Sequence, residues 1–226
     1  TVAAYASTRT IPIVFGGSNG VVELGLVKTL AHPGGNVTGV QNFSWELGGK
    51  RLQLLKQALP KIKRVGVLVQ PDYPLIEREF NMIEKAATTL GVTVIRADAK
   101  VPGDIDGAIA SLVKNRVEAL LSTQTALFQG QRKRILALAA SRRLPVVGVR
   151  SEFAEDGALI SYSFLIGDQY RISARIVDKI LKGAKPADIP VEQPTKFDLA
   201  VNLKAAKTLG ITMPGEIMLQ ATRVIE

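Results

Sequence analysis

The stretch that decides the fold runs from Val65 to Val94 and reads VGVLVQPDYPLIEREFNMIEKAATTLGVTV. Its first five residues are apolar or glycine, which is typical of a strand buried on both faces. Apolar residues then recur at helical spacing, namely Ile76, Phe80, Ile83, Ala87 and Leu90. Gly91 ends this helix, and residues 92–95 begin a second strand. The stretch therefore predicts one strand-helix-strand unit of a parallel sheet.

The same alternation continues toward the C-terminus. A helix over residues 105–112, capped by Asp104, leads to a strand at 117–122. The helix carrying Phe128, Ile135 and Leu138 leads to a fourth strand at 145–149. Residues 61–163 thus predict a complete doubly wound lobe.

The first sixty residues predict only part of a second lobe. They contain only two strands, Ile11 to Phe15 and Val37 to Val40, each expected to precede a helix. A further helix is expected over 168–182, with Ile172, Ile176, Val177 and Ile180 as its apolar stripe, and a strand near 197–201. The predicted fold class is α/β, with two Rossmann-like lobes that have parallel sheets. Lobe one, which is incomplete, takes residues 1–60 and 165–193, and lobe two takes 61–163 and 194–226.

Composition excludes several kinds of function. The 226 residues include no cysteine, so disulfides, thiolate metal sites and thiol nucleophiles are excluded. One histidine and no acidic cluster at ligand spacing predict no metal, and we expect no cofactor. The net charge of +9 alone does not distinguish a nucleic-acid partner from an anionic surface or a solvated shell. The densest basic cluster is Arg132, Lys133, Arg134, Arg142 and Arg143, and it lacks interleaved aromatic residues, so we expect a solvated helix face and no nucleic acid.

Two glycine-containing motifs resemble patterns of catalytic or phosphate-binding sites. Gly16 to Gly20 fits the G-x-S-x-G pattern of serine hydrolases, but the only histidine, His32, follows Ser18 by 14 residues and is expected to be a turn residue. We therefore expect these glycines to let backbone amides approach a ligand. Gly48 and Gly49 precede Lys50 like a phosphate loop, but they fall where a helix starts, which predicts close helix packing.

A ligand is expected at the carboxyl ends of the predicted strands, where loops of a parallel sheet converge. The side chains there are mostly hydroxyl, amide or aromatic groups, which suit a small polar ligand with a flat part. The candidate ligand-binding residues are Ser18, Asn19, Asn42, Phe43, Asp72, Tyr73, Thr123, Gln124, Ser151, Glu152 and Tyr162. Asp72 and Glu152 are the candidates for binding an ammonium group, and no catalytic residue is expected.

Several segments together resemble the tryptophan/tyrosine-type substrate-binding proteins of ABC transporters. The resemblance is carried by TIPIVF at 10–15, LAHPGGNVTG at 30–39, GGKRLQLLK at 48–56, GALISY at 157–162 and ILKGAKPADIPVEQPTKF at 180–197. It implies a type I periplasmic-binding-protein fold that captures an amino-acid-like or aromatic solute between two lobes, for an ABC importer with a membrane permease. It also implies a periplasmic or membrane-anchored extracellular location and no enzymatic activity. The alternatives are the ligand-sensing core of a transcriptional regulator and a serine hydrolase using Ser18.

The sequence differs from the family pattern at its N-terminal side. Family members begin with a signal sequence and several strand-helix units before the Thr-Ile-Pro-Ile-Val segment, and this sequence lacks both. Where the family often has Gly-Asp-Pro-Val after the first strand, residues 18–21 read Ser-Asn-Gly-Val. We expect an open strand edge in lobe one, which favours self-association through the first fifteen residues.

Overall fold

The computed structural model describes all residues from 1 to 226 and divides into two compact units. Unit 1 comprises residues 1–43 and 164–197, and unit 2 comprises residues 44–163 and 198–226. The sequence placed the first boundary after residue 60, but the structure places it after Phe43. The reason is that η1 (Ser44–Glu46) and α2 (Leu47–Ala58) pack on α3 (Ile76–Leu90) of unit 2.

Helices α2 and α3 approach closely because two glycines lie between them. A Cβ atom on Gly48 would lie 2.7 Å from Cγ1 of Ile83, and one on Gly49 would lie 3.2 Å from Cβ of Ala86. The predicted role of these glycines in close helix packing is confirmed.

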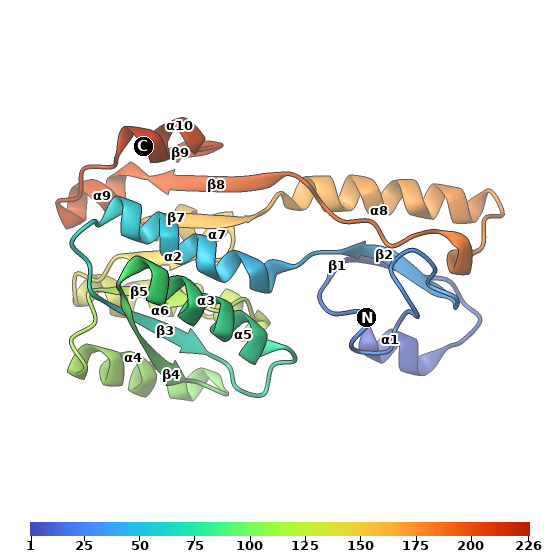
Figure 1. Cartoon of the computed structure of the whole chain (residues 1–226), viewed down its shortest axis with the longest axis horizontal. Coiled ribbons are helices and arrows are strands. Elements are labelled where there is room, and N and C mark those ends of the chain that lie inside the picture. Colours follow the sequence, from blue (N-terminus) through green and yellow to red (C-terminus); the bar gives the residue numbers. More distant parts are fainter. The chain divides into compact units, whose positions relative to one another are not determined.

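The central feature of unit 2 is a seven-stranded sheet with the order β4-β3-β5-β6-β7-β8-β9 (Figure 1). Neighbouring strands from β4 to β7 are parallel, and so are β8 and β9. Asn202, the last residue of β8, donates its N–H to the carbonyl of Leu159, just before β7, so β8 runs opposite to β7. The strands are β3 (Arg64–Val69), β4 (Thr93–Asp98), β5 (Ala119–Ser122), β6 (Val146–Gly148), β7 (Ile160–Phe164), β8 (Phe197–Asn202) and β9 (Arg223–Ile225).

Both faces of this sheet are covered, as a mainly parallel sheet requires. Helices α2 and α3 cover one face together with α9 (Leu203–Leu209) and α10 (Gly215–Gln220), over a core that includes Val67 and Leu121. The other face has a core that includes Leu68 and Phe128 and is covered by α4 (Ile105–Lys114), α5 (Ala126–Gly130), α6 (Arg132–Ser141) and α7 (Ser151–Glu155). The short helix η2 (Pro102–Asp104) buries no residue and leads into α4. The predicted α/β fold of residues 61–163 is confirmed.

Asp104 occupies the expected position before α4 but does not cap it with its side chain. Its carboxylate instead accepts the backbone N–H groups of Lys100 and Val101, so it fixes the turn that leads into the helix. None of the helices in either unit is long and apolar enough to cross a bilayer.

Unit 1 contains α1 (Val2–Ser7), the parallel strands β1 (Ile13–Ser18) and β2 (Val37–Gln41), α8 (Ile166–Leu181) and η3 (Pro186–Asp188). Helix α8 matches the predicted helix and buries Ile176 fully, but Val177 of the predicted apolar stripe is 40% exposed. The helix predicted after the first strand does not form. Gly20 and Gly25 adopt left-handed backbone conformations, with φ of 62° and 65°, and residues 21–25 form turns instead.

Candidate functional site

The polar residues of unit 2 gather where its parallel strands end. Three loops leave the strands there: residues 70–75 after β3, residues 123–125 after β5, and residues 149–150 after β6, which lead into the start of α7. Because β3, β5 and β6 are neighbours in the sheet, the loops share one edge. We call this edge, together with Tyr162 on β7, the strand-end face.

A buried ion pair lies under the strand-end face. Nη1 of Arg51, on α2, lies 3.0 Å from Oε1 of Glu79, on α3, and the Arg51 side chain has no exposed surface. Arg51 also donates from Nε to the carbonyl of Tyr162 at 2.9 Å, and from Nη2 to Oε1 of Gln124 at 3.4 Å. The second carboxylate oxygen of Glu79 accepts the backbone N–H of Gln124. The pair therefore ties two helices to the loop after β5 and to β7.

Burial shifts the protonation equilibria of this pair. Desolvation raises the pKa of Glu79 to about 7, although the Arg51 charge and two hydrogen bonds act in the opposite direction. Desolvation likewise lowers the pKa of Arg51, against the stabilising charge of Glu79. A carboxyl group that changes protonation near neutral pH thus lies directly behind Gln124.

Two half-buried tyrosines flank the pair. Tyr73, in the loop after β3, and Tyr162, on β7, pack against the core on the α2–α3 side of the sheet. Burial raises the pKa of both phenols, and the nearby Glu79 charge adds to the effect on Tyr73. Leu75 ends the first of these loops in a left-handed conformation with φ of 66°, a strained geometry for leucine. The face therefore presents aromatic groups on a constrained backbone.

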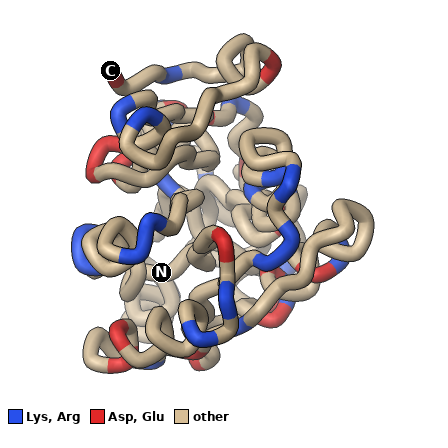
Figure 2. The backbone as a smooth tube through the Cα atoms, turned by 90° about the vertical axis from the view of Figure 1, so that its left-hand side faces the viewer, with Lys and Arg blue, Asp and Glu red and all other residues tan.

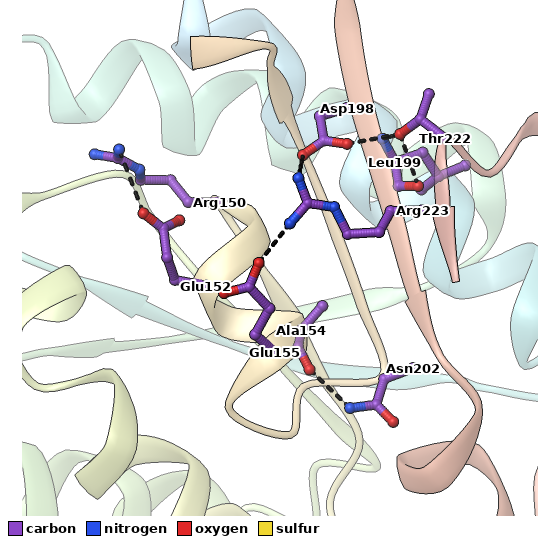
Figure 3. Close-up of polar contacts among 9 residues, drawn as sticks. All are labelled: Arg150, Glu152, Ala154, Glu155, Asp198, Leu199, Asn202, Thr222 and Arg223. Carbon is purple, nitrogen blue, oxygen red and sulfur yellow. Dashed lines mark hydrogen bonds and ion pairs between the residues drawn. The ribbon is translucent and has the colours of Figure 1, made fainter. Parts of the chain in front are cut away.

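Arg150 and Glu152 form a loose ion pair after β6. Nη2 of Arg150 lies 3.5 Å from Oε1 of Glu152, and each side chain is about one-third exposed, at 33% and 34%. Nε of Arg150 and Oε2 of Glu152 have no hydrogen-bond partner. Figure 3 shows the contrast with Glu155 on the same helix, whose carboxylate turns to Arg223 of β9 instead. The Arg150–Glu152 pair thus keeps both a cationic and an anionic group incompletely satisfied.

Other predicted residues of unit 2 have different surroundings. Asp72 is exposed and lies 3.5 Å from Nζ of Lys100, beside β4. Thr123 is fully buried and donates its hydroxyl to the carbonyl of Leu68, so it closes the end of β5. Ser151 starts α7 next to Arg150 and Glu152 and is partly buried. The structure thus gathers Tyr73, Gln124 and Tyr162 around the buried pair and leaves Asp72 apart.

Unit 1 brings its own predicted residues to the ends of β1 and β2. The backbone N–H of Asn42 donates to the carbonyl of Ser18 at 3.0 Å, and Asn19 and Phe43 follow these two residues in the chain. The Asn42 side chain donates to the carbonyl of Gly17 and to Oε1 of Gln169 on α8, and its own Oδ1 lacks a hydrogen-bond partner. The ligand-binding role of these residues stays a prediction.

The geometry of Ser18 does not match a hydrolase nucleophile. Its hydroxyl forms a hydrogen bond of 2.7 Å with the hydroxyl of Thr1, and it shares no hydrogen bond with His32. His32 lies in a turn, where its backbone N–H donates to Oγ1 of Thr29. A serine nucleophile needs a base within hydrogen-bond reach, and this arrangement provides none.

Four polar residues of these faces were not singled out from the sequence. Arg51 and Glu79 carried a usable signal, since each is a charged residue on the apolar stripe of its helix, spaced three or four residues from buried neighbours such as Leu55 and Ile83. Arg150 directly follows the strand predicted at 145–149, which is the same signal that located Ser151 and Glu152. Gln169 carried no such signal, because its role depends on a contact with Asn42, far away in the sequence.

Comparisons with known proteins agree with this architecture. The family described as ABC transporter substrate binding protein matches residues 1–225. A tyrosine-binding protein of Clostridioides difficile (strain R20291) is 26% identical over 211 residues, which are 92% of this chain and 59% of the relative. The chain thus spans less than two thirds of the length of that curated relative.

Two solved structures are closely similar. One is the ABC domain from Streptococcus pneumonia in complex with L-Trp, with a TM-score of 0.88 and 25% identity over 97% of this chain and 74% of the other. The second is a conserved domain protein from Vibrio cholerae, with a TM-score of 0.87 and 29% identity over 98% of this chain and 74% of the other. The predicted type I periplasmic-binding-protein fold is confirmed, and the chain belongs to the ABC transporter substrate-binding protein family.

Proposed function

We propose that this chain is the solute-binding component of an ABC importer, that it performs no catalysis, and that its solute is an aromatic α-amino acid. Family membership supports the transport role. Tyrosine and L-Trp, named for two relatives, support the class of solute. The observation that carries the proposal for this chain is the Arg150–Glu152 pair on the strand-end face.

An α-amino acid carries one carboxylate and one ammonium group, so its binding site must present a cation and an anion close together. Arg150 and Glu152 lie 3.5 Å apart, and each keeps a polar atom without a partner. We propose that the Arg150 guanidinium binds the solute carboxylate and that Glu152 binds the ammonium group. Asp72 is less suited to bind the ammonium group, since its side chain is 66% exposed and faces Lys100.

The aromatic part of the solute would meet Tyr73 and Tyr162. Both rings are partly buried and belong to the loop after β3 and to β7 of the same face. An aromatic pair contributes about 0.5–1.5 kcal/mol beyond the burial of its area. This contribution favours tryptophan, tyrosine or phenylalanine over an aliphatic amino acid.

Isothermal titration calorimetry and thermal unfolding with L-Trp, L-Tyr, L-Leu and D-ribose test the proposal. A solute at a hundred times its dissociation constant should raise the free energy of unfolding by about 2.7 kcal/mol. We expect this stabilisation with L-Trp or L-Tyr. Stabilisation by ribose, with no effect of the amino acids, would contradict the proposed solute class.

Matched variants on α7 test the proposed contacts. Glu152→Gln should weaken binding at least tenfold, because it removes the charge that faces the ammonium group. Glu155→Gln is the control, since it removes the same charge from the same helix but from the side that faces Arg223 (Figure 3). Equal affinity of both variants would exclude Glu152 from the site.

Three further parts of the proposal concern partners and location. We propose a membrane permease as the partner and a periplasmic or membrane-anchored extracellular location, on the basis of the family alone. We also propose self-association through residues 1–15, because β1 pairs only with β2 and Ile11 is 65% exposed. Analytical ultracentrifugation tests this last part, and a monomer at all concentrations would contradict it.

A further inference from the structure

The edge of unit 2 where its parallel strands begin is strongly basic. Lysine and arginine occur in the segments before β3, β5 and β6, and on α9 directly after β8. Nine of the 29 basic residues lie there, and all nine are exposed: Lys61, Lys63, Arg64, Lys114, Arg116, Arg142, Arg143, Lys204 and Lys207. We call this set the basic edge. Figure 2 looks at the protein from the side where these strands begin and shows blue segments on several of its loops.

The acidic residues near the basic edge have other partners than the charged groups of its nine cations. Glu118 uses Oε2 to accept the backbone N–H groups of Lys63 and Arg64. Glu155 and Asp156 pair with Arg223 and Arg132, which are not among the nine cations. None of the nine cations takes part in an ion pair.

The opposite edge of the same sheet is different. On and beside the strand-end face, Arg150 pairs with Glu152, Lys100 with Asp72, and Arg96 with Glu77 and Asp98. Unpaired positive charge is therefore concentrated on one edge of unit 2 and is not spread evenly over it. An evenly solvated basic shell would not show this asymmetry.

The basic edge also contains an apolar recess. A pocket of about 510 Å³ opens there, with the cations Lys61 and Arg143 at its border. Its apolar lining includes Leu59, Pro145 and Ile211. The surface thus combines cations with accessible apolar groups, which suits an anionic amphiphile.

We propose that the basic edge binds an anionic lipid bilayer surface. Each lysine or arginine near such a membrane adds to the electrostatic attraction between protein and lipid. Clusters of about four to eight such residues are typical of surfaces that bind anionic lipids. The distance from β3 to β8 spans four strand spacings, or about 19 Å, so the cations form a broad face. No aromatic residue lies in the segments 59–64, 114–118, 142–145 or 203–212, so bases of a single-stranded nucleic acid would find no stacking partner.

This geometry leaves the solute site accessible. In a parallel sheet the strand beginnings and the strand ends lie on opposite edges, so a membrane at the basic edge does not cover Arg150 and Glu152. Membrane binding is therefore independent of the identity of the solute, and each proposal can fail without the other.

Sedimentation with phosphatidylcholine vesicles, with and without phosphatidylglycerol, tests the proposal on the full chain. We expect binding only to vesicles that contain phosphatidylglycerol, and loss of binding at high salt. The triple variant Lys61→Gln, Lys114→Gln and Lys207→Gln should reduce partitioning roughly a hundredfold. These three side chains are exposed and form no side-chain hydrogen bond or ion pair, so the variant should keep its fold, which circular dichroism and thermal unfolding can check.

The matched control is Lys85→Gln, Lys133→Gln and Lys179→Gln, which removes the same charge from exposed positions outside the basic edge. We expect the control to bind vesicles as the parent chain does. Equal losses in the two triple variants would show a general charge effect and would overturn the proposal. Absence of vesicle binding would overturn it as well. So would tight binding of a DNA duplex if the three edge lysines contributed to DNA binding and not to vesicle binding.

Discussion

The guanidinium of Arg51 and the carboxylate of Glu79 meet at 3.0 Å, with both side chains buried between helices α2 and α3. A buried ion pair of this kind contributes little net stability, but it becomes costly when only one partner is removed. Because Arg51 also holds Gln124 and the carbonyl of Tyr162, the pair fixes parts of the strand-end face.

Replacing Arg51 with methionine should lower the free energy of unfolding by about 3–5 kcal/mol, because it leaves the Glu79 carboxyl buried without a cation. The loss is limited by protonation of that carboxyl. Urea unfolding measures the effect. The double variant Arg51→Met and Glu79→Leu should be more stable than Arg51→Met alone, and an equal or lower stability would contradict the account.

Glu79 should make the stability of the protein depend on pH between about 4.5 and 7. Its pKa is raised from 4.5 to about 7 by folding, so the folded state binds more protons in this window. Stability from this group is therefore fully present below pH 4.5 and is lost as the pH rises through 7, on the order of 3 kcal/mol. Urea unfolding at several pH values should show this slope in the parent chain and not in Glu79→Gln. A difference between the two that is independent of pH would contradict the raised pKa.

Glycine-to-alanine substitutions should have opposite effects at two helical positions. Gly48→Ala places a methyl group 2.7 Å from Ile83 and should cost about 1–3 kcal/mol through overpacking. Gly107→Ala, in α4, meets no atom within 4 Å and should stabilise by about 0.5–1 kcal/mol. Thermal unfolding of the two variants measures both changes. Stabilisation by both substitutions would show that helix propensity, and not the contact of α2 with α3, decides the outcome.

Asn202 joins two helices through its two side-chain atoms. Oδ1 accepts the N–H of Ala205 and so caps α9. Nδ2 donates to the carbonyl of Ala154 on α7 (Figure 3). Asn202→Ala should cost about 1–2 kcal/mol, since it removes the cap and the hydrogen bond to the carbonyl of Ala154, which still accepts the backbone N–H of Gly157. Asn202→Ser keeps an oxygen that can cap α9 and should recover part of this loss. If serine is no better than alanine in thermal unfolding, the cap contributes nothing.

The sequence predicted the parallel sheet of unit 2 because its strands are continuous apolar runs and its helices repeat apolar residues at fixed spacing. The strand-end loops around Tyr73, Gln124 and Glu152 could also be located, because in a parallel sheet they must follow the strands. Their use as a ligand site remains a prediction.

Three features required tertiary information. The boundary after Phe43 depends on the packing of α2 on α3, which local spacing does not reveal. The missing helix after β1 depends on left-handed glycines at Gly20 and Gly25. The pairing of Glu155 with Arg223, and not with Arg150, depends on which side of α7 faces β9. In the first and third cases the deciding contact joins residues that neither period nor spacing connects, whereas in the second the deciding feature is the backbone conformation of two glycines.

The antiparallel pairing of β7 with β8 has a practical consequence for protein engineering. The chain leaves unit 2 after residue 163 and re-enters at residue 198, and the rings of Phe164 and Phe197 stack at these two points with centroids 5.0 Å apart. Antiparallel neighbours can be joined by a tight hairpin turn. Residues 166–195 can therefore be replaced by a short linker, so that unit 2 becomes an uninterrupted polypeptide that carries the strand-end face on its own.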